Sequence, residues 1–356
     1  MDLQLGTPAP LFSAPSHTNP EFALGAIGGR YVLLGFLPQD AEGRAAMLGA
    51  VEGTCDLFHE SRVMVFLVER DAERYHAAVE KAAVRWFHDA EGEIAKLYGA
   101  ADAEGALTGP RWVLLDPTLR LIAWRPADAT ALMFSTLRRL GLPENHAGVP
   151  LHAPVLIVPR VLEPQLCRRL IDLYQAHGGE QSGTMRTING RTVGVLSNMK
   201  DRRDAPIEDP ALQDALRARI TRRLLPEIAK AFCYKATRIE RYIVACYDAS
   251  SGGFFRPHRD NTTAGTAHRQ FAVSINLNSE EFEGGDLRFP EYGTRTYRPP
   301  TGGAVVFSCS LLHEATPVTK GVRYATLPFL YDEAGAAIRE ANLHLLDPSP
   351  AMQLAS

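Results

Sequence analysis

The chain has 356 residues, 46% hydrophobic and 22% charged, which is enough material for two domains with separate cores. The net charge of −3 and the pI near 6.4 lack the basic excess of nucleic-acid-binding proteins, so we expect no nucleic-acid partner. The sequence contains no run of 18 apolar residues, and its N-terminus has no basic segment followed by an apolar one. We therefore expect no membrane partner and a cytoplasmic location.

The five cysteines form no recognisable set. They are odd in number and scattered, and none belongs to a Cys-x-x-Cys motif. This pattern favours buried free thiols over a disulfide framework or a structural zinc site.

Residues 1–140 alternate short apolar runs with helix-like segments. The runs at 31–37, 62–68 and 112–115 are continuously apolar, as expected for strands buried on both faces. Residues 41–58 and 71–84 lie between the runs and have helical periodicity. This order predicts an α/β domain.

Three stretches of this region resemble the peroxiredoxins, which are thiol peroxidases with a thioredoxin-like fold. They are Thr-Pro-Ala-Pro-Leu-Phe at 7–12, Gly-Arg-Tyr-Val-Leu-Leu-Gly-Phe-Leu-Pro at 29–38 and Gly-Pro-Arg-Trp-Val-Leu-Leu-Asp at 109–116. That family carries its peroxidatic cysteine seven residues after the proline matched by Pro38, where this chain has Ala45. The resemblance implies a thioredoxin-like domain over 1–140 that has lost its reactive centre.

Neither Cys55 nor Arg111 restores that centre. Cys55 lies about 20 Å along the expected helix, too far from its N-terminus for the helix dipole to lower the thiol pKa. Arg111 matches the family's active-site arginine, but without a thiolate the better interpretation is a structural ion pair or a hydrogen bond to the backbone. Pro110 is a candidate for the cis proline of this fold.

Residues 141–153 are the predicted linker, because three prolines and two glycines between 141 and 154 interrupt all periodicity. The second domain is predicted over 154–335, followed by a C-terminal tail at 336–356. It begins with an amphipathic helix at 164–177, and a second helix follows Pro210. The polar stretch 179–206 between these helices predicts an irregular loop, a candidate lid.

The rest of the second domain reads as closely spaced short strands separated by glycine and proline turns. The expected strands are 239–247, 271–277, 286–289, 294–297, 304–307 and 324–331. So many short strands predict a double-stranded β-helix, or jelly roll, with flanking helices.

His258 and Asp260 are two residues apart, so on a strand both side chains point to one side and form a clip for a divalent metal. His313 follows 55 residues later, and Arg323 ten residues after that. Two histidines and one carboxylate leave coordination positions open, as a non-haem Fe(II) oxygenase requires. A buried Arg323 needs an anionic partner, which a cosubstrate would supply.

Residues 154–331 resemble the Fe(II)- and 2-oxoglutarate-dependent dioxygenases of the prolyl 4-hydroxylase type. The matching motifs are Val-Ala-Cys-Tyr at 244–247, His-Arg-Asp-Asn at 258–261, Glu-Gly-Gly-Asp-Leu-Arg-Phe-Pro-Glu at 283–291 and His-Glu at 313–314. The resemblance implies Fe(II), 2-oxoglutarate and O2 as cofactor and cosubstrates, with ascorbate as a candidate reductant. The iron ligands would be His258, Asp260 and His313.

The resemblance also assigns the residues that hold 2-oxoglutarate. Arg323 would pair with its distal carboxylate, and Tyr247 would lie near its other carboxylate end. Asn276 stands where related enzymes carry a tyrosine that reaches the distal carboxylate, and Phe255 stands where the family often has tyrosine. His268, ten residues after His258, is interpreted as a loop or supporting residue.

The leading hypothesis is a dioxygenase that hydroxylates a protein, peptide or amino-acid side chain while 2-oxoglutarate becomes succinate and CO2. Its partner would be a protein, peptide or small-molecule substrate. One alternative is a thiol peroxidase with an accessory domain. Another is a non-catalytic protein that binds 2-oxoglutarate or responds to oxygen. The sequence holds no signal for an oligomeric state.

Overall fold

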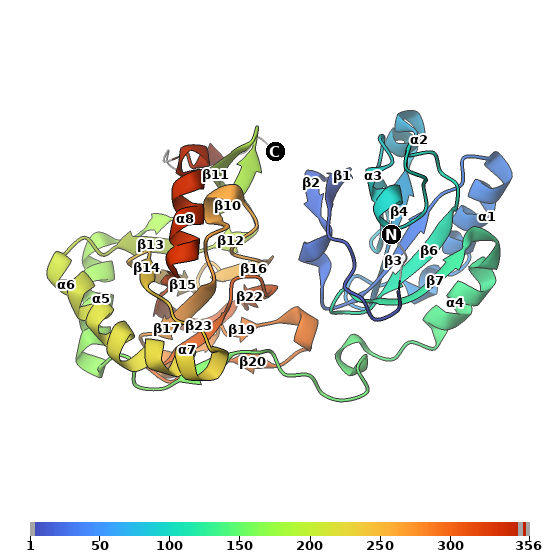
Figure 1. Cartoon of the computed structure of the whole chain (residues 1–356). Coiled ribbons are helices and arrows are strands. Elements are labelled where there is room, and N and C mark those ends of the chain that lie inside the picture. The colour runs from blue at the N-terminus through green and yellow to red at the C-terminus, as the bar shows by residue number, and fades with distance from the viewer. Residues whose placement is uncertain (1–3, 348–351, 354–356) are drawn as a thin grey trace. The chain divides into compact units, whose positions relative to one another are not determined.

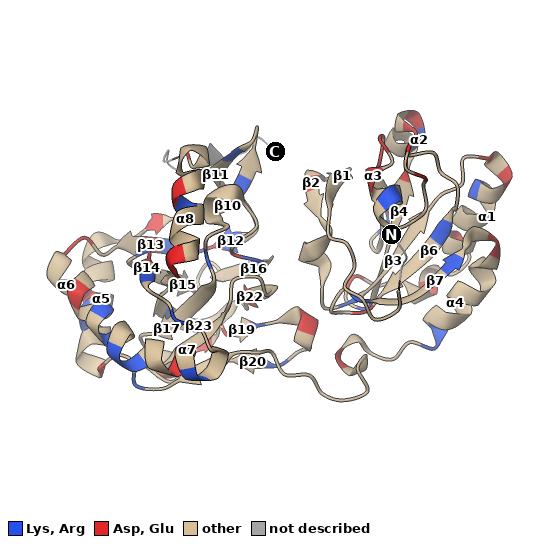
Figure 2. Ribbon diagram, viewed as in Figure 1, with Lys and Arg blue, Asp and Glu red and all other residues tan. Residues whose placement is uncertain are grey.

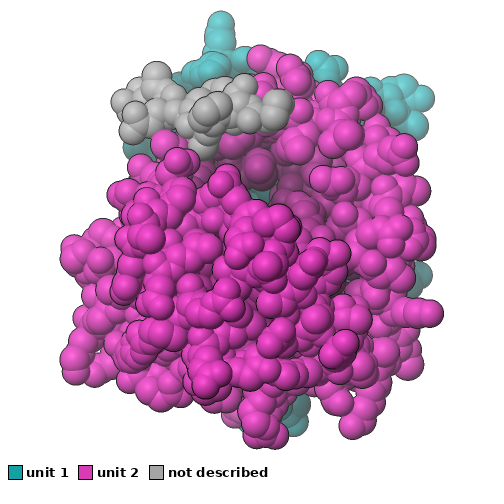
Figure 3. All heavy atoms as spheres, turned by 90° about the vertical axis from the view of Figure 1, so that its left-hand side faces the viewer, with its two compact units in different colours: residues 1–153, 290–294 teal, residues 154–289, 295–356 magenta. Residues whose placement is uncertain are grey.

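The computed structural model describes residues 4–347 and 352–353. The chain divides into two compact units, which Figure 3 shows in different colours. Unit 1 comprises residues 1–153 with 290–294, and unit 2 comprises 154–289 with 295–356. No helix of the described chain is both long and apolar enough to cross a lipid bilayer.

Unit 1 is built on one five-stranded mixed sheet with the order β5-β4-β3-β6-β7 (Figure 1). Its strands are β3 (Tyr31–Phe36), β4 (Val63–Glu69), β5 (Val84–His88), β6 (Arg111–Leu115) and β7 (Leu121–Pro126). The hairpin of β1 (Ser13–Ser16) and β2 (Asn19–Ala23) precedes it. The helices are α1 (Ala41–Glu52), α2 (Ala72–Ala77), α3 (Glu93–Leu97) and α4 (Thr130–Arg138).

The central strands of unit 1 are apolar throughout because both faces of the sheet are covered. Every residue of β3 and β4 is buried. Alternate side chains belong to two different cores: Leu34 packs with Phe66 on one face, and Leu33 packs with Trp112 on the other. The continuously apolar runs therefore predicted this sheet correctly.

Both helices predicted in this region are longer than the observed ones. Helix α1 ends at Glu52, and α2 ends at Ala77, so residues 78–83 connect it to β5 rather than continuing a helix to Val84. The periodic pattern continued past both ends because the apolar residues that follow pack on the sheet from non-helical segments. The described residues contain no cis peptide bond, so the suggestion that Pro110 is cis is wrong.

Unit 2 contains two facing sheets. The larger has the path β14-β24-β17-β23-β15-β13-β9, formed by β14 (Arg238–Glu240), β24 (Phe329–Tyr331), β17 (Phe271–Asn276), β23 (Val318–Thr326), β15 (Ile243–Asp248), β13 (Arg203–Pro206) and β9 (Glu180–Gln181). Strands β8 (Leu156–Val158), β18 (Phe282–Gly284) and β21 (Ala304–Ser308) join it off this path. The smaller sheet has the order β12-β16-β22-β19-β20, formed by β12 (Lys200–Asp201), β16 (Phe254–His258), β22 (His313–Ala315), β19 (Leu287–Arg288) and β20 (Thr296–Tyr297).

Helices cover the outer face of the larger sheet. They are α5 (Pro164–His177), α6 (Pro210–Arg219) and α7 (Leu225–Phe232), and a π-helical turn at 220–224 joins the last two. Val244 of β15 and Ile275 of β17 pack with these helices in the main core. Their neighbours Ala245 and Ser274 point to the opposite face, towards the smaller sheet. This alternation gives the jelly roll a polar interior between its two sheets.

The stretch 179–206 is not the irregular lid predicted from its polarity. It forms five short strands, among them the hairpin of β10 (Thr184–Ile188) and β11 (Arg191–Leu196). Its charged residues are partly buried, with Lys200 and Arg202 at 6% and 3% exposure. Polar strands of this kind lack the alternation that marks a strand in sequence.

The predicted C-terminal tail begins inside a helix. Helix α8 spans Glu333–Asn342, and β25 (Met352–Gln353) pairs in parallel with β11. Residues 348–351 and 354–356 of that predicted tail lie outside the described part of the chain. Acidic and basic positions are both present on each unit in the view of Figure 2.

Candidate active site

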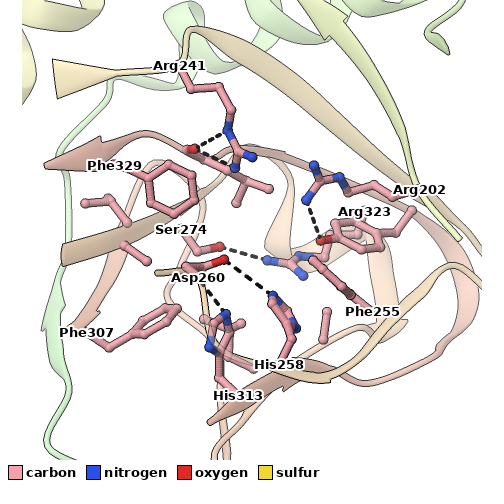
Figure 4. Close-up of a pocket in the computed structure, with 16 residues that line it drawn as sticks. Arg202, Arg241, Phe255, His258, Asp260, Ser274, Phe307, His313, Arg323 and Phe329 are labelled. Atoms are coloured by element: carbon pink, nitrogen blue, oxygen red, sulfur yellow. Dashed lines mark hydrogen bonds and ion pairs between the residues drawn. The ribbon is translucent and has the colours of Figure 1, made fainter. Parts of the chain in front are cut away.

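A polar pocket lies between the two sheets of unit 2 (Figure 4). Its volume is about 470 Å³, including its open mouth. The polar lining residues are Arg202, Arg241, Tyr247, His258, Asp260, Ser274, His313 and Arg323. The apolar lining residues are Phe255, Ala272, Val273, Leu287, Phe307, Ala315, Leu327 and Phe329.

Strand pairing in the smaller sheet brings the two predicted histidines together. His258 ends β16 and His313 begins β22, and they are direct cross-strand partners. Their rings are 4.3 Å apart between centroids. Asp260 lies just beyond the end of β16, with its backbone N–H bonded to the Cys309 carbonyl. The common direction of the His258 and Asp260 side chains therefore depends on this hydrogen-bonded turn as well as on strand alternation.

The three side chains present one ligand atom each to a common point. His258 Nε2 lies 3.5 Å from Asp260 Oδ1, and His313 Nε2 lies 3.3 Å from Asp260 Oδ2. One ligand atom of each residue lies within 4.8 Å of the others, so the group could hold a metal ion. No other such group of three His, Cys, Asp or Glu side chains occurs among residues 4–347 and 352–353.

Backbone carbonyls fix the tautomer of both histidines. His258 Nδ1 lies 2.8 Å from the Arg256 carbonyl, and His313 Nδ1 lies 3.0 Å from the Leu311 carbonyl. A carbonyl only accepts hydrogen bonds, so each Nδ1 carries the proton and each Nε2 keeps its lone pair. This is the orientation seen when histidine binds a metal through Nε2.

Burial keeps His313 in its metal-binding form. Its burial and the charge of His258 lower the pKa of His313 from 6.5 to about 4. Burial alone would raise the pKa of Asp260, but attraction to His313 and a hydrogen bond from His258 hold it well below its usual range. At neutral pH the group thus offers a carboxylate and an uncharged His313 imidazole, as a divalent cation requires.

Arg323 reaches the pocket from the larger sheet. It is 2% exposed and pairs across the strands with Tyr247, so its guanidinium lies 5.0 Å from the centroid of that ring. Its Nη2 donates to Ser274 Oγ at 2.8 Å, and both Nε and Nη2 donate to Asn276 Oδ1 at 3.2 Å. These partners are neutral, so they leave the buried charge uncompensated.

One nitrogen of the Arg323 guanidinium lacks a hydrogen bond within the described chain. Nη1 is buried and has no hydrogen-bond partner among the described residues. Burial lowers the pKa of Arg323, but a guanidinium remains charged at neutral pH. A buried, charged donor without a partner is costly, so this position fits an anion that enters the pocket.

Tyr247 lines the pocket as expected, and its hydroxyl lies 3.5 Å from Arg202 Nη1. Asn276 is placed differently, because it does not line the pocket. Its Nδ2 donates to Ser279 Oγ at 3.0 Å while its Oδ1 accepts from Arg323. The amide oxygen therefore orients Arg323, and one of the two amide N–H groups is used by Ser279.

Sequence reasoning missed Arg202, Arg241 and Ser274. Arg202 donates from Nε and Nη2 to the two carboxylate oxygens of Asp204, at 2.7 and 2.6 Å. Burial opposes the charge of Asp204, but Arg202 and Lys200 lower the pKa of its carboxyl to about 2. An Arg-x-Asp pair in a polar stretch is a weak signal in sequence, because such pairs are common on solvated surfaces.

His268 lies outside the pocket lining, in agreement with its interpretation as a supporting residue. It is 2% exposed and forms a short contact with Glu240, which also accepts from Arg269 Nη2 at 2.8 Å. Burial opposes ionisation of Glu240, but the hydrogen bond from His268 and the attraction of Arg269 lower its pKa from 4.5 to about 2. This network ties β14 to the segment that precedes β17.

The Glu240 network predicts an acid-sensitive contribution to stability. Because the folded-state pKa of Glu240 is depressed, its contribution is complete above about pH 4.5 and is lost as the pH falls towards 2. We expect Glu240→Gln to remove on the order of 3 kcal/mol of pH-dependent stability. Urea unfolding of the full chain at pH 7, 5, 4 and 3 would measure this effect. Parallel pH profiles of variant and wild type would contradict it.

The position in unit 1 that matches the peroxidatic cysteine of peroxiredoxins holds no thiol. Ala45 lies in α1, and its neighbour Arg44 places Nη2 2.9 Å from Oε2 of the buried Glu69. Cys55 is exposed and lies beyond the C-terminal end of α1, the end that does not stabilise a thiolate. Arg111 Nε donates to the Gly109 carbonyl at 2.8 Å, so of the two structural roles predicted for Arg111 the structure has the backbone hydrogen bond.

Peroxide consumption tests this assignment. We expect Cys55→Ala to leave the rate of hydrogen peroxide loss unchanged, at the level of a protein-free control, because no thiol occupies the position of Ala45. The assay would follow peroxide with excess dithiothreitol present. Catalytic consumption by the wild type that disappears in Cys55→Ala would restore the thiol peroxidase alternative.

Together, the jelly roll, its His-Asp-His group and the buried arginine form an arrangement typical of mononuclear metal-dependent oxygenases. Comparison with known families is more specific. Residues 242–331 match the 2OG-Fe(II) oxygenase superfamily, and residues 5–123 match the AhpC/TSA family. The AhpC/TSA match lies in unit 1 and the 2OG-Fe(II) oxygenase match lies in unit 2, and the predicted thioredoxin-like and jelly-roll folds are confirmed.

Several hydroxylases resemble part of the chain. A PKHD-type hydroxylase of Synechococcus sp. (strain JA-2-3B'a(2-13)) is 25% identical over 147 residues, which are 40% of this chain and 63% of the relative. A PKHD-type hydroxylase of Cupriavidus metallidurans is 25% identical over 185 residues, 48% of this chain and 74% of the relative. The chain therefore spans less than two thirds of the Synechococcus protein.

Solved structures of similar fold include a prolyl hydroxylase from Trichoplax adhaerens, in complex with a hypoxia inducible factor peptide fragment. It has a TM-score of 0.38 and 20% identity, over 52% of this chain and 86% of that one. A viral collagen prolyl hydroxylase from Paramecium Bursaria Chlorella virus-1 has a TM-score of 0.37 and 17% identity, over 50% of this chain and 96% of that one.

Proposed function

We propose that the chain is an Fe(II)- and 2-oxoglutarate-dependent hydroxylase. His258, Asp260 and His313 would hold the iron, and Arg323 would bind the distal carboxylate of 2-oxoglutarate. The observation that carries the proposal is the buried Nη1 of Arg323, which has no partner in the described chain. Arg323 lines the same pocket as the three side chains that could hold a metal.

The residues present fit the proposed cofactor. Two imidazole nitrogens and one carboxylate suit Fe(II) and leave coordination positions for other ligands. When bound, the iron would bring 2-oxoglutarate and O2 together and supply the oxidising chemistry. The Nδ1 hydrogen bonds of His258 and His313 keep both rings turned towards Asp260, so the ligand set is preorganised.

Arg323 would fix the cosubstrate from the opposite sheet. Its guanidinium is held by Ser274 and Asn276 and stacks near Tyr247, so it offers Nη1 in a fixed direction. Nη1 lies in a site from which bulk water is largely excluded, where a charge-assisted hydrogen bond to a carboxylate is strong. The residue would therefore select a dicarboxylic acid over a monocarboxylic 2-oxo acid.

The substrate we propose is a protein, a peptide or an amino acid, which would gain a hydroxyl group on a side chain. The PKHD-type hydroxylase relatives support this class. Phe255, Phe307 and Phe329 give the pocket apolar walls that would receive an aliphatic side chain and exclude water. The intact ligand group and the unpartnered Arg323 favour an enzyme over a non-catalytic binding protein.

Succinate release tests the proposal. Protein loaded with Fe(II) should convert 2-oxoglutarate to succinate in air, faster with a cell lysate present, and mass spectrometry should find a product heavier by one oxygen atom. Ascorbate would be included and omitted in parallel. Failure to produce succinate under any of these conditions would remove the proposed activity.

A further inference from the structure

The pocket contains a cation that the proposed chemistry does not use. Three arginines line it: Arg202, Arg241 and Arg323. Arg202 is paired bidentately with Asp204, and Arg323 is proposed to receive 2-oxoglutarate. Asp260 is the only pocket-lining carboxylate in the described chain and belongs to the metal group. Arg241 therefore has no assigned counter-charge.

The contacts of Arg241 are to a neutral group only. Its Nε and Nη2 donate to the Leu327 carbonyl at 3.1 and 2.9 Å. No carboxylate among residues 4–347 lies within ion-pair distance of it, and its Nη1 has no hydrogen-bond partner in that range. Figure 4 shows the guanidinium entering the pocket from the side opposite His258 and His313. Asp204 and Asp260 attract its charge without forming an ion pair with it, so an anion in the pocket would be its first charged hydrogen-bond partner.

The backbone at Arg241 is strained in a way that places the side chain. Its φ angle is +71°, in the left-handed region that long side chains rarely adopt. Arg241 stands between the end of β14 and the start of β15, so the larger sheet turns inward there. Strain of this kind persists where the surrounding structure enforces it and is concentrated at functional sites.

Phe329 separates Arg241 from a second cation. The guanidinium of Arg241 lies 4.5 Å from the ring centroid, and that of Arg269 lies 4.0 Å from it. Arg269 is neutralised by Glu240 and does not line the pocket. The ring therefore holds Arg241 in place by stacking. Burial and the charge of Arg202 lower the pKa of Arg241 to about 10, so the guanidinium is still protonated at neutral pH.

We infer that Arg241 is a second anion subsite and that the substrate carries a carboxylate. The inference rests on the proposed function, because it places 2-oxoglutarate on Arg323 and the substrate on Arg241. The arginine fork would receive the carboxylate, while Phe307 and Phe329 would pack against the aliphatic part that faces the metal group. The carboxylate would be either the α-carboxylate of an amino acid or chain terminus, or an Asp or Glu side chain within a peptide.

Ligand-induced stabilisation of the full chain tests this subsite without turnover. The protein would be loaded with Zn(II), which binds the same donors but is not redox-active, and saturated with 2-oxoglutarate. Its Tm would be followed against four probe pools: N-acetyl amino acids, their carboxamides, amidated acetyl dipeptides that contain Asp or Glu, and the same dipeptides with Asn or Gln. The two acidic pools separate the two sources of the carboxylate.

We expect at least one acidic pool to raise Tm in the wild type, and its neutral counterpart to raise it far less. Arg241→Gln should weaken the response to that acidic pool about tenfold or more, and Arg241→Lys should retain part of it. Arg111→Gln is the matched control, because Arg111 also stacks on an aromatic ring and donates to a backbone carbonyl but belongs to unit 1 and does not line the pocket. It should respond like the wild type.

Three results would overturn the subsite: equal responses to acidic and neutral pools, a wild-type response in Arg241→Gln, or no response of the wild type to any pool. Unchanged 2-oxoglutarate binding by Arg241→Gln would show that the variant is folded at the pocket. A carboxylate- and Arg241-dependent shift without succinate release from the iron-loaded protein would support the subsite and refute the hydroxylase. Succinate release with neutral substrates, at a rate that Arg241→Gln does not change, would support the hydroxylase and refute the subsite.

Discussion

Replacing His313 by alanine is expected to abolish both Fe(II) binding and 2-oxoglutarate turnover. Its Nε2 is one of only three ligand atoms in the group, and its Nδ1 is already committed to the Leu311 carbonyl. Changes in residues that merely support a metal ligand cost about 10- to 100-fold, so loss of a ligand should lower succinate formation by more than about 100-fold. Metal analysis after gel filtration and a succinate assay would measure the two effects.

His268→Gln is the control for this variant. His268 is as deeply buried as His313, but it contacts Glu240 and lies outside the pocket lining. Glutamine can still donate a hydrogen bond to that carboxylate, so we expect iron content and turnover close to those of the wild type. Full iron binding by His313→Ala, or equal losses in the two variants, would contradict the assignment of His313 as a ligand.

Replacing Arg323 by glutamine is expected to weaken 2-oxoglutarate binding by about 30-fold or more, because loss of one partner of a buried, hydrogen-bonded charge pair costs about 2–5 kcal/mol. Metal binding should be unaffected, since Arg323 belongs to the larger sheet and the ligands to the smaller one. Calorimetric titration of the Zn(II)-loaded protein with 2-oxoglutarate would give the dissociation constant.

Arg323→Lys separates charge from geometry at the same position. Lysine keeps the charge but lacks the planar fork that Ser274 and Asn276 orient, so it should recover only part of the affinity. A glutamine variant that binds 2-oxoglutarate like the wild type would place the cosubstrate elsewhere in the pocket.

Most of the sheet structure could be predicted because apolar patterns report burial directly. Continuous apolar runs predicted the doubly covered strands of unit 1, and short apolar runs between glycine and proline turns predicted β15 and β17 of unit 2. Short polar strands were missed, notably those of residues 179–206, because their pairing is stabilised by buried charged networks rather than by an apolar face. Helix α8 was missed for a different reason: Gly335 is its only buried residue, so it lacks the apolar stripe that marks a helix in sequence.

The site residues differ in how far the sequence indicated them. His258, Asp260, His313 and Arg323 follow a fixed order with characteristic spacings, so motif reasoning found them. Arg241 has no such pattern. It enters the pocket only because the chain takes a left-handed turn between two strands that would otherwise read as one continuous run.

The role of Asn276 required strand register. Position suggested a contact with the cosubstrate, which stays a prediction, and the pairing of β17 with β23 adds that its amide oxygen accepts from the guanidinium of Arg323. Register depends on contacts between residues almost 50 positions apart, which spacing in the sequence does not encode.

The most direct test of the central claim is an anaerobic titration of the protein with Fe(II) and 2-oxoglutarate, followed by visible absorption. Chelation of the 2-oxo acid to protein-bound Fe(II) produces a visible band only when both bind at one site. We predict that the wild type develops this band with one Fe(II) per chain and that His313→Ala does not. A band of equal strength in both proteins, or none in the wild type with both ligands in excess, would contradict the account.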